Sequence, residues 1–289
     1  MDIYGCDPHV FAGGEQLVLT LQYGCIADAR RLIEDNIEKF RPIAKYPSGP
    51  GNGVTIMLGL CFVIVTQHIH NLSQHVQTLL ALVGCTFDNI QDILENVPAA
   101  LGGLFGLLRV EWHIKAWFVL HGDMPASKAI AWLESLPDNQ EYYKASVNLP
   151  TCSYGQIHGA YNPVWIALAH EKVGLDDGAI RFADLQLETD LLKSGAPLCR
   201  WPQVFALACK GRVLAKQDRH SEALAEFQAA ITTSKESFSL VEAFALRELA
   251  NYAGGGDAAV QAGRALAIKL KTFEGRMTQA EFDGLNIGP

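Results

Sequence analysis

The stretch FALACKGRVLAKQDRHSEALAEFQAAI, residues 205–231, carries the pattern from which we predict the fold. Apolar residues recur every three or four positions on both sides of Asp218, which is typical of two amphipathic helices joined by a short turn. Gly211 in the first helix and Ala223 in the second are 12 residues apart. Small residues at these positions let the two helices approach closely, and Phe227 fills the space beyond them. We therefore predict an antiparallel helical hairpin.

The same 12-residue offset recurs in neighbouring segments. Three further pairs carry it: Trp117 and Ala129, Ala167 and Ala179, and Ala250 and Ala262. Turn residues stand at matching places between the predicted helices, as at Gly174 and Asp218. The bulky Trp117 predicts that its own unit is distorted. The recurrence indicates a series of helical hairpins.

Helical periodicity extends over most of the chain, and strand signals are scarce. The predicted helices are 14–23, 26–40, 54–72, 73–83, 87–95, 99–120, 126–136, 139–147, 163–173, 176–189, 203–216, 221–233, 239–252, 257–270 and 279–283. Segments rich in glycine and proline separate some of them, the longest at 46–53. The sequence thus predicts an all-α protein.

The spacing of small residues resembles that of the tetratricopeptide repeat (TPR) family. The best unit matches the family at four positions: Gly211, Ala223, Phe227 and Ala230. Leu207 stands at the family's first-helix aromatic position and Lys235 at its closing proline. Successive units lie 50, 44 and 39 residues apart, which is longer and less regular than the family norm. The resemblance implies a TPR-like α-solenoid, a right-handed superhelical stack of antiparallel helix hairpins.

We predict one helical repeat domain over residues 1–289. Within it, 1–98 holds divergent N-terminal helices, 99–270 the repeat-bearing helix pairs, and 271–289 a C-terminal extension. The segment 4–8, Tyr-Gly-Cys-Asp-Pro, resembles one in the C-terminal helical arrays of large signalling ATPases and cyclases. That resemblance implies a stand-alone relative or a piece of such an array. The phosphate-binding pattern GxxxxGK[ST] is absent from the sequence.

Helix geometry predicts where a partner binds. In the first helix of each pair, the residues at positions −3, +1 and +5 from the small residue lie on one stripe of the helix surface, away from the contact with the second helix. When helix pairs stack, such stripes align on a concave face. The stripe consists of Val164, Leu168, Lys172, Ala208, Arg212, Lys216, Arg247, Asn251 and Gly255. The candidate binding residues are Lys172, Arg212, Lys216, Arg247 and Asn251. The positive charge of the two lysines and two arginines favours an acidic peptide or partner protein, although such side chains are often ordinary solvated charges.

Composition excludes several function classes. The formal net charge of −8 disfavours a nucleic-acid binder. The most apolar run, 54–65, is too short to span a bilayer, which takes about 20 residues. The start of the chain lacks the pattern of a secretory signal. The seven cysteines form no CxxC pair, which favours reduced thiols and a cytoplasmic protein.

The sequence offers little support for catalysis. His68 and His75 share a helix face but lie seven apart, whereas helical zinc sites use a spacing of four. No GxSxG elbow is present. We predict no catalytic residue, metal or cofactor, and a non-enzymatic interaction scaffold or regulatory module. Two alternatives remain: a helical-fold enzyme with a pocket between the His68–His75 helix and the tryptophan-rich pair at 99–136, and a structural subunit that uses the 54–65 helix as a contact surface.

Overall fold

The computed structural model describes residues 28, 31, 86–90, 110–137, 162–188, 200–237 and 239–283. Throughout these ranges the regular elements are helices, and no strand occurs among them. The predicted all-α class is therefore confirmed for this part of the chain. The helices predicted before residue 86 and at 139–147 lie outside the described residues.

The helices begin and end close to the predicted positions. They are α7 (Val110–Leu120), α8 (Ala126–Glu134), α11 (Asn162–Val173), α12 (Asp176–Glu188), α13 (Trp201–Lys216), α14 (His220–Ser234), α15 (Ser239–Asn251), the 3-10 turn η4 (Ala253–Gly255), α16 (Gly256–Lys271) and α17 (Gln279–Asp283). From α11 onward every boundary falls within two residues of the prediction. The turn residues Gly174 and Asp218 adopt positive φ angles of 79° and 58°, which glycine and aspartate tolerate better than most residues.

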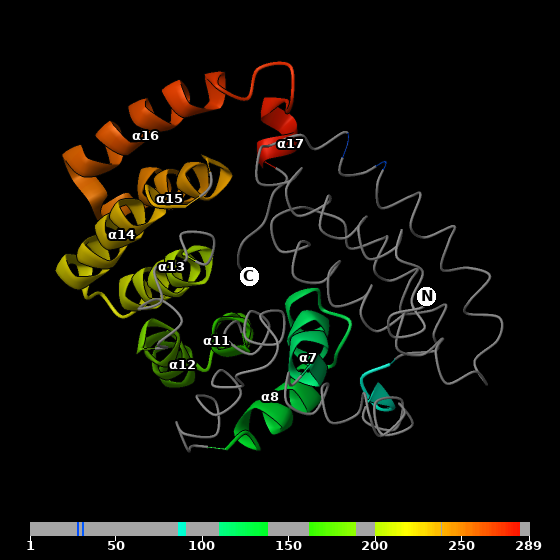
Figure 1. Ribbon diagram of the computed structural model, residues 1–289. Helices are drawn as coiled ribbons and strands as arrows, with labels where there is room; N and C mark the ends of the chain where they lie inside the picture. The colour runs from blue at the N-terminus through cyan, green and yellow to red at the C-terminus, as the bar shows by residue number, and fades with distance from the viewer. Residues whose placement is uncertain are drawn as a thin grey trace.

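Consecutive helices pack as pairs (Figure 1). α11 packs on α12, α13 on α14, and α15 on α16, and each pair contacts the next. The first helices of the pairs, α11, α13 and α15, also contact one another in a row. α7 packs mainly on α11 rather than on α8. The bulky Trp117, which is fully buried, explains why this unit departs from the close pairing of the others.

The small residues lie in the helix contacts where the sequence places them. Ala167, Ala179 and Ala223 are fully buried, and Ala262 nearly so. Gly211 is buried against the ring of Phe227: a Cβ atom added to Gly211 would lie 2.7 Å from Cε1 of that ring. The close approach of α13 and α14 therefore depends on the missing side chain at residue 211.

The five tryptophans belong to the core. The buried set is Trp112, Trp117, Trp132, Trp165 and Trp201. The ring centroids of Trp165 on α11 and Trp201 on α13 lie 5.5 Å apart, so this pair ties two helix pairs together. None of the described helices is both long enough and apolar enough to cross a membrane.

Candidate functional site

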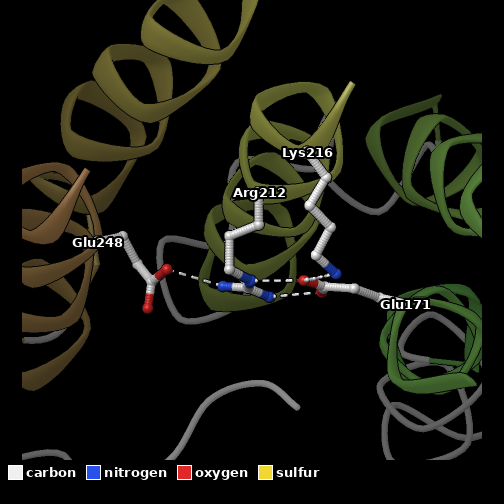
Figure 2. Close-up of polar contacts among 4 residues, drawn as sticks. All are labelled: Glu171, Arg212, Lys216 and Glu248. Atoms are coloured by element: carbon white, nitrogen blue, oxygen red, sulfur yellow. Dashed lines mark hydrogen bonds and ion pairs between the residues drawn. The ribbon is translucent and has the colours of Figure 1, made fainter. Parts of the chain in front are cut away.

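A network of charged side chains joins the three first helices (Figure 2). Arg212 on α13 donates two hydrogen bonds to Glu171 on α11, from Nε to Oε1 and from Nη2 to Oε2, both 2.8 Å long. Its Nη1 donates to Oε2 of Glu248 on α15 at 2.9 Å. Lys216, one turn after Arg212, places Nζ 3.8 Å from Oε1 of Glu171. One arginine thus links α11, α13 and α15.

The network is largely withdrawn from solvent. The side chain of Glu171 is 1% exposed, and that of Arg212 is 21% exposed. The fully buried thiol of Cys209 lies close enough to the Glu171 carboxylate for the two groups to influence each other's pKa. A buried carboxylate is stable only when it is paired and hydrogen-bonded, and the bidentate arginine meets that requirement.

Opposing effects act on the ionisation of this network. Burial by itself raises the pKa of Glu171, but the charge and hydrogen bonds of Arg212, helped by Lys216, outweigh burial and leave the pKa below its ordinary value. Burial and the neighbouring Glu171 charge raise the pKa of the Cys209 thiol well above its ordinary value. Glu171 is therefore ionised and Cys209 neutral at physiological pH, so this cysteine is not poised as a nucleophile.

The five candidate binding residues occupy different surroundings. Lys172, Lys216 and Asn251 are exposed near the C-terminal ends of α11, α13 and α15. Arg212 is partly buried in the network. Arg247 is also partly buried and donates a hydrogen bond from Nη1 to the carbonyl oxygen of a residue in α17, at 3.0 Å. The structure therefore brings Arg212 and Lys216 together around one carboxylate.

The rest of the predicted stripe is covered. Its buried members are Val164, Leu168, Ala208 and Gly255. The first two lie on α11, which packs against α7, α12 and α13, so little of that helix reaches solvent before its last turn. Accessible polar surface on the first helices is thereby concentrated toward their C-terminal ends, at Lys172, Lys216 and Asn251.

The sequence prediction missed the two carboxylates. Glu171 directly precedes one residue of the predicted stripe in the chain, and Glu248 directly follows another. Their offsets from the small residues of their helices, +4 and −2, fall at about 40° and 160° around the axis, on either side of the stripe. A helical wheel therefore predicts that both carboxylates lie near the stripe, but it does not predict which carboxylate pairs with Arg212.

Histidine 170 is a core residue rather than a ligand. Its ring is buried, its Nδ1 lies 2.8 Å from the carbonyl oxygen of Ile166, and its ring centroid lies 5.1 Å from that of Phe182. Within the described ranges no group of three or more histidine, cysteine or acidic residues is arranged to hold a metal ion. The His68–His75 segment lies outside these ranges.

Acidification is expected to destabilise the fold partly through His170. Burial lowers the pKa of His170, outweighing the opposite effect of its backbone hydrogen bond, and the charge of Arg181 lowers it further. Below the unfolded-state pKa, which is about 6.5, the unfolded chain binds a proton that the folded chain resists. The free energy of unfolding should therefore decrease as the pH falls from 7.5 to 5.5. The loss in the free energy of unfolding that is due to His170 grows until the pH falls below the lowered pKa of His170 in the folded protein.

His170→Gln should make this pH dependence shallower without abolishing it, because burial also lowers the pKa of His121. Urea unfolding at several pH values measures the slope of the free energy of unfolding against pH. A loss of stability in the variant that is the same at every pH does not change this slope. Equal slopes for the wild type and His170→Gln would contradict the assignment.

A surface groove lies at the other end of the helix row. It has a volume of about 650 Å³. It is lined by Gly263, Leu266, Ala267, Leu270, Lys271, Glu274, Met277 and Gln279. Its lining comes from α16 and the segment leading into α17, and it contains no histidine or cysteine. The arrangement offers apolar contact rather than a set of converging catalytic groups.

Comparisons with known proteins add no identity. No protein-family model, no curated protein and no solved structure matches this chain. The features of the molecule that bear on its function are the helix pairing and the charged residues on α11, α13 and α15.

Proposed function

We propose that this chain is a non-enzymatic interaction module, a TPR-like α-solenoid that binds an acidic peptide or partner protein on its concave face. In this proposal the helix pairs form a right-handed superhelical stack, and α11, α13 and α15 line the concave side. One observation carries the proposal: Arg212 draws three neighbouring first helices together, while Lys216, one turn after Arg212, and Lys172, next to Glu171 in the chain, remain exposed.

The local charge supports an acidic ligand. The cations Lys172, Arg212, Lys216 and Arg247 stand against the carboxylates of Glu171, Glu248 and Asp283, which leaves a net formal charge of one positive in a chain of net charge −8. Arg212 already has its carboxylate partners, so it orients the helices. The exposed Lys172 and Lys216 are available to meet the ligand's carboxylates without breaking the buried pair. Such exposed ion pairs are individually weak and sensitive to salt, which predicts modest affinity.

A charge-reversal experiment tests this surface. Lys172→Glu/Lys216→Glu is expected to weaken binding of a fluorescein-labelled peptide rich in aspartate and glutamate at least tenfold, measured by fluorescence anisotropy at low ionic strength. Lys235→Glu/Arg264→Glu is the matched control, because it makes the same charge change at two exposed positions, one directly after α14 and one on α16. It should bind nearly as the wild type does.

Three outcomes would count against the proposal. They are equal weakening by both double variants, no binding of the acidic peptide by the wild type, and equal binding of a lysine-rich peptide of the same length. The enzyme and structural-subunit alternatives depend on the 54–65 and 68–75 segments, outside the described residues, and stay predictions.

A further inference from the structure

The short helix α17 contacts one of the first helices through an aromatic side chain. It follows α16 after a turn of the chain (Figure 1). The Phe282 side chain is 1% exposed, and its ring stacks on Phe244 with centroids 5.6 Å apart and an interplanar angle of 16°. The predicted C-terminal extension thus covers part of α15.

This contact uses a residue of the predicted binding stripe. The Arg247 guanidinium carbon lies 5.1 Å from the centroid of Phe244 and 5.0 Å from that of Phe282, within cation–π range of both rings. Arg247 also donates its hydrogen bond to the Phe282 carbonyl oxygen. The next residue, Asp283, adds a negative charge that acts on Arg247. An aromatic ring, a backbone carbonyl and a carboxylate are the groups that a bound peptide segment would supply.

The docked helix depends on few anchors. α17 has five residues, too few to be a stable helix in isolation. Phe282 is its deeply buried anchor, whereas Gln279, Ala280 and Asp283 are exposed. Met277, just before the helix, adds a second buried contact. In the part of the chain that the structure describes, α17 is held mainly by one aromatic side chain and one arginine, so a competitor with the same groups can displace it.

We propose that Phe244 and Arg247 form a recognition site for a peptide segment in which an aromatic residue precedes an acidic one, and that Phe282 and Asp283 occupy it as an internal ligand. The inference deepens the proposed function and rests on it, since the site lies on the same row of first helices. A partner with an aromatic–acidic segment competes with α17 for this site. The chain's own end then lowers the apparent affinity for every partner that binds there.

The test uses the full chain and a fluorescein-labelled peptide with the sequence of residues 276–289, RMTQAEFDGLNIGP. Phe282→Ala empties the site, so this variant should bind the peptide at least tenfold more tightly than the wild type, whose own Phe282 competes. A peptide with alanine in place of its phenylalanine should not bind. Adding Arg247→Lys to Phe282→Ala should weaken binding at least threefold, because lysine keeps the charge but loses the planar stacking group.

A milder variant covers the case in which Phe282→Ala unfolds the chain. Asp283→Lys leaves Phe282 in place and replaces an exposed carboxylate, so it should raise peptide affinity in the same direction by a smaller factor. Equal affinity of the wild type and the folded variants, or binding that is indifferent to Arg247→Lys, would overturn the inference. The variants could bind this peptide while the peptide rich in aspartate and glutamate fails to bind. That result would refute the lysine surface of the proposed function and would support the site at Phe244 and Arg247.

Discussion

Replacing Arg212 by methionine is expected to lower the free energy of unfolding by about 3–5 kcal/mol, the range found when one partner of a buried ion pair is removed. The substitution leaves Glu171, with its 1% exposed side chain, without its bidentate partner. It also deprives Glu248 of its hydrogen bond and disconnects α13 from α11 and α15 in this network. Urea unfolding at neutral pH, monitored by far-ultraviolet circular dichroism, measures the loss.

Lys216→Met is the matched control, because it removes a cation from the same face of the same helix. The Lys216 side chain is 52% exposed and lies 3.8 Å from Glu171, so its loss should cost at most about 1 kcal/mol. The double variant Glu171→Gln/Arg212→Met should recover part of the stability lost in Arg212→Met, since no charge is left stranded at residue 171. An Arg212→Met protein within about 1 kcal/mol of the wild type would show that the network contributes little.

The pH dependence separates this effect from a loss of packing. In the wild type the lowered pKa of Glu171 contributes stability above its unfolded-state pKa, and this contribution is lost as the pH falls through the folded-state value. In Arg212→Met the stranded carboxylate takes up a proton more readily. The difference in stability between the two proteins should therefore shrink toward acidic pH, whereas a packing defect would leave it unchanged.

Gly211→Ala is expected to lower the free energy of unfolding by about 1–3 kcal/mol, the usual cost of overpacking a core. The added Cβ would lie 2.7 Å from Cε1 and 2.9 Å from both Cδ1 and Cζ of Phe227. That ring is only 2% exposed and cannot swing into solvent. The gain in helix propensity, about 0.5–1 kcal/mol, is smaller than the cost of moving α14.

A second helical glycine provides the control for this prediction. Gly263 lies on α16, and the one neighbour that a Cβ there would meet among the described residues is the Cβ of Ala250 at 3.9 Å, an ordinary contact distance. Gly263→Ala should therefore stabilise the protein by about 0.5–1 kcal/mol through helix propensity alone. Thermal and urea unfolding of both variants give the comparison. The packing argument fails if Gly211→Ala proves as stable as the wild type or more so.

Much of the fold could be predicted from the sequence because the responsible forces are local. The spacing of apolar residues, the turns at Gly174 and Asp218, and the small residues opposite Phe227 depend on neighbours within one hairpin. The bounds predicted for the short helix α17 also agree with the structure, although its stability depends on the contacts of Phe282. A period of three to four residues is a property of a single helix, so it can be recognised without knowledge of the rest of the chain.

The candidate site depended on tertiary structure. The sequence predicts Lys172, Arg212, Lys216, Arg247 and Asn251 as one binding stripe, but only the packed helices show that Arg212 is held between Glu171 and Glu248. Likewise, the docking of Phe282 on Arg247 joins residues 35 positions apart. Helix geometry determines which face a side chain is on, but ionic partners and burial depend on which helix lies opposite, and that is decided only when the pairs pack together.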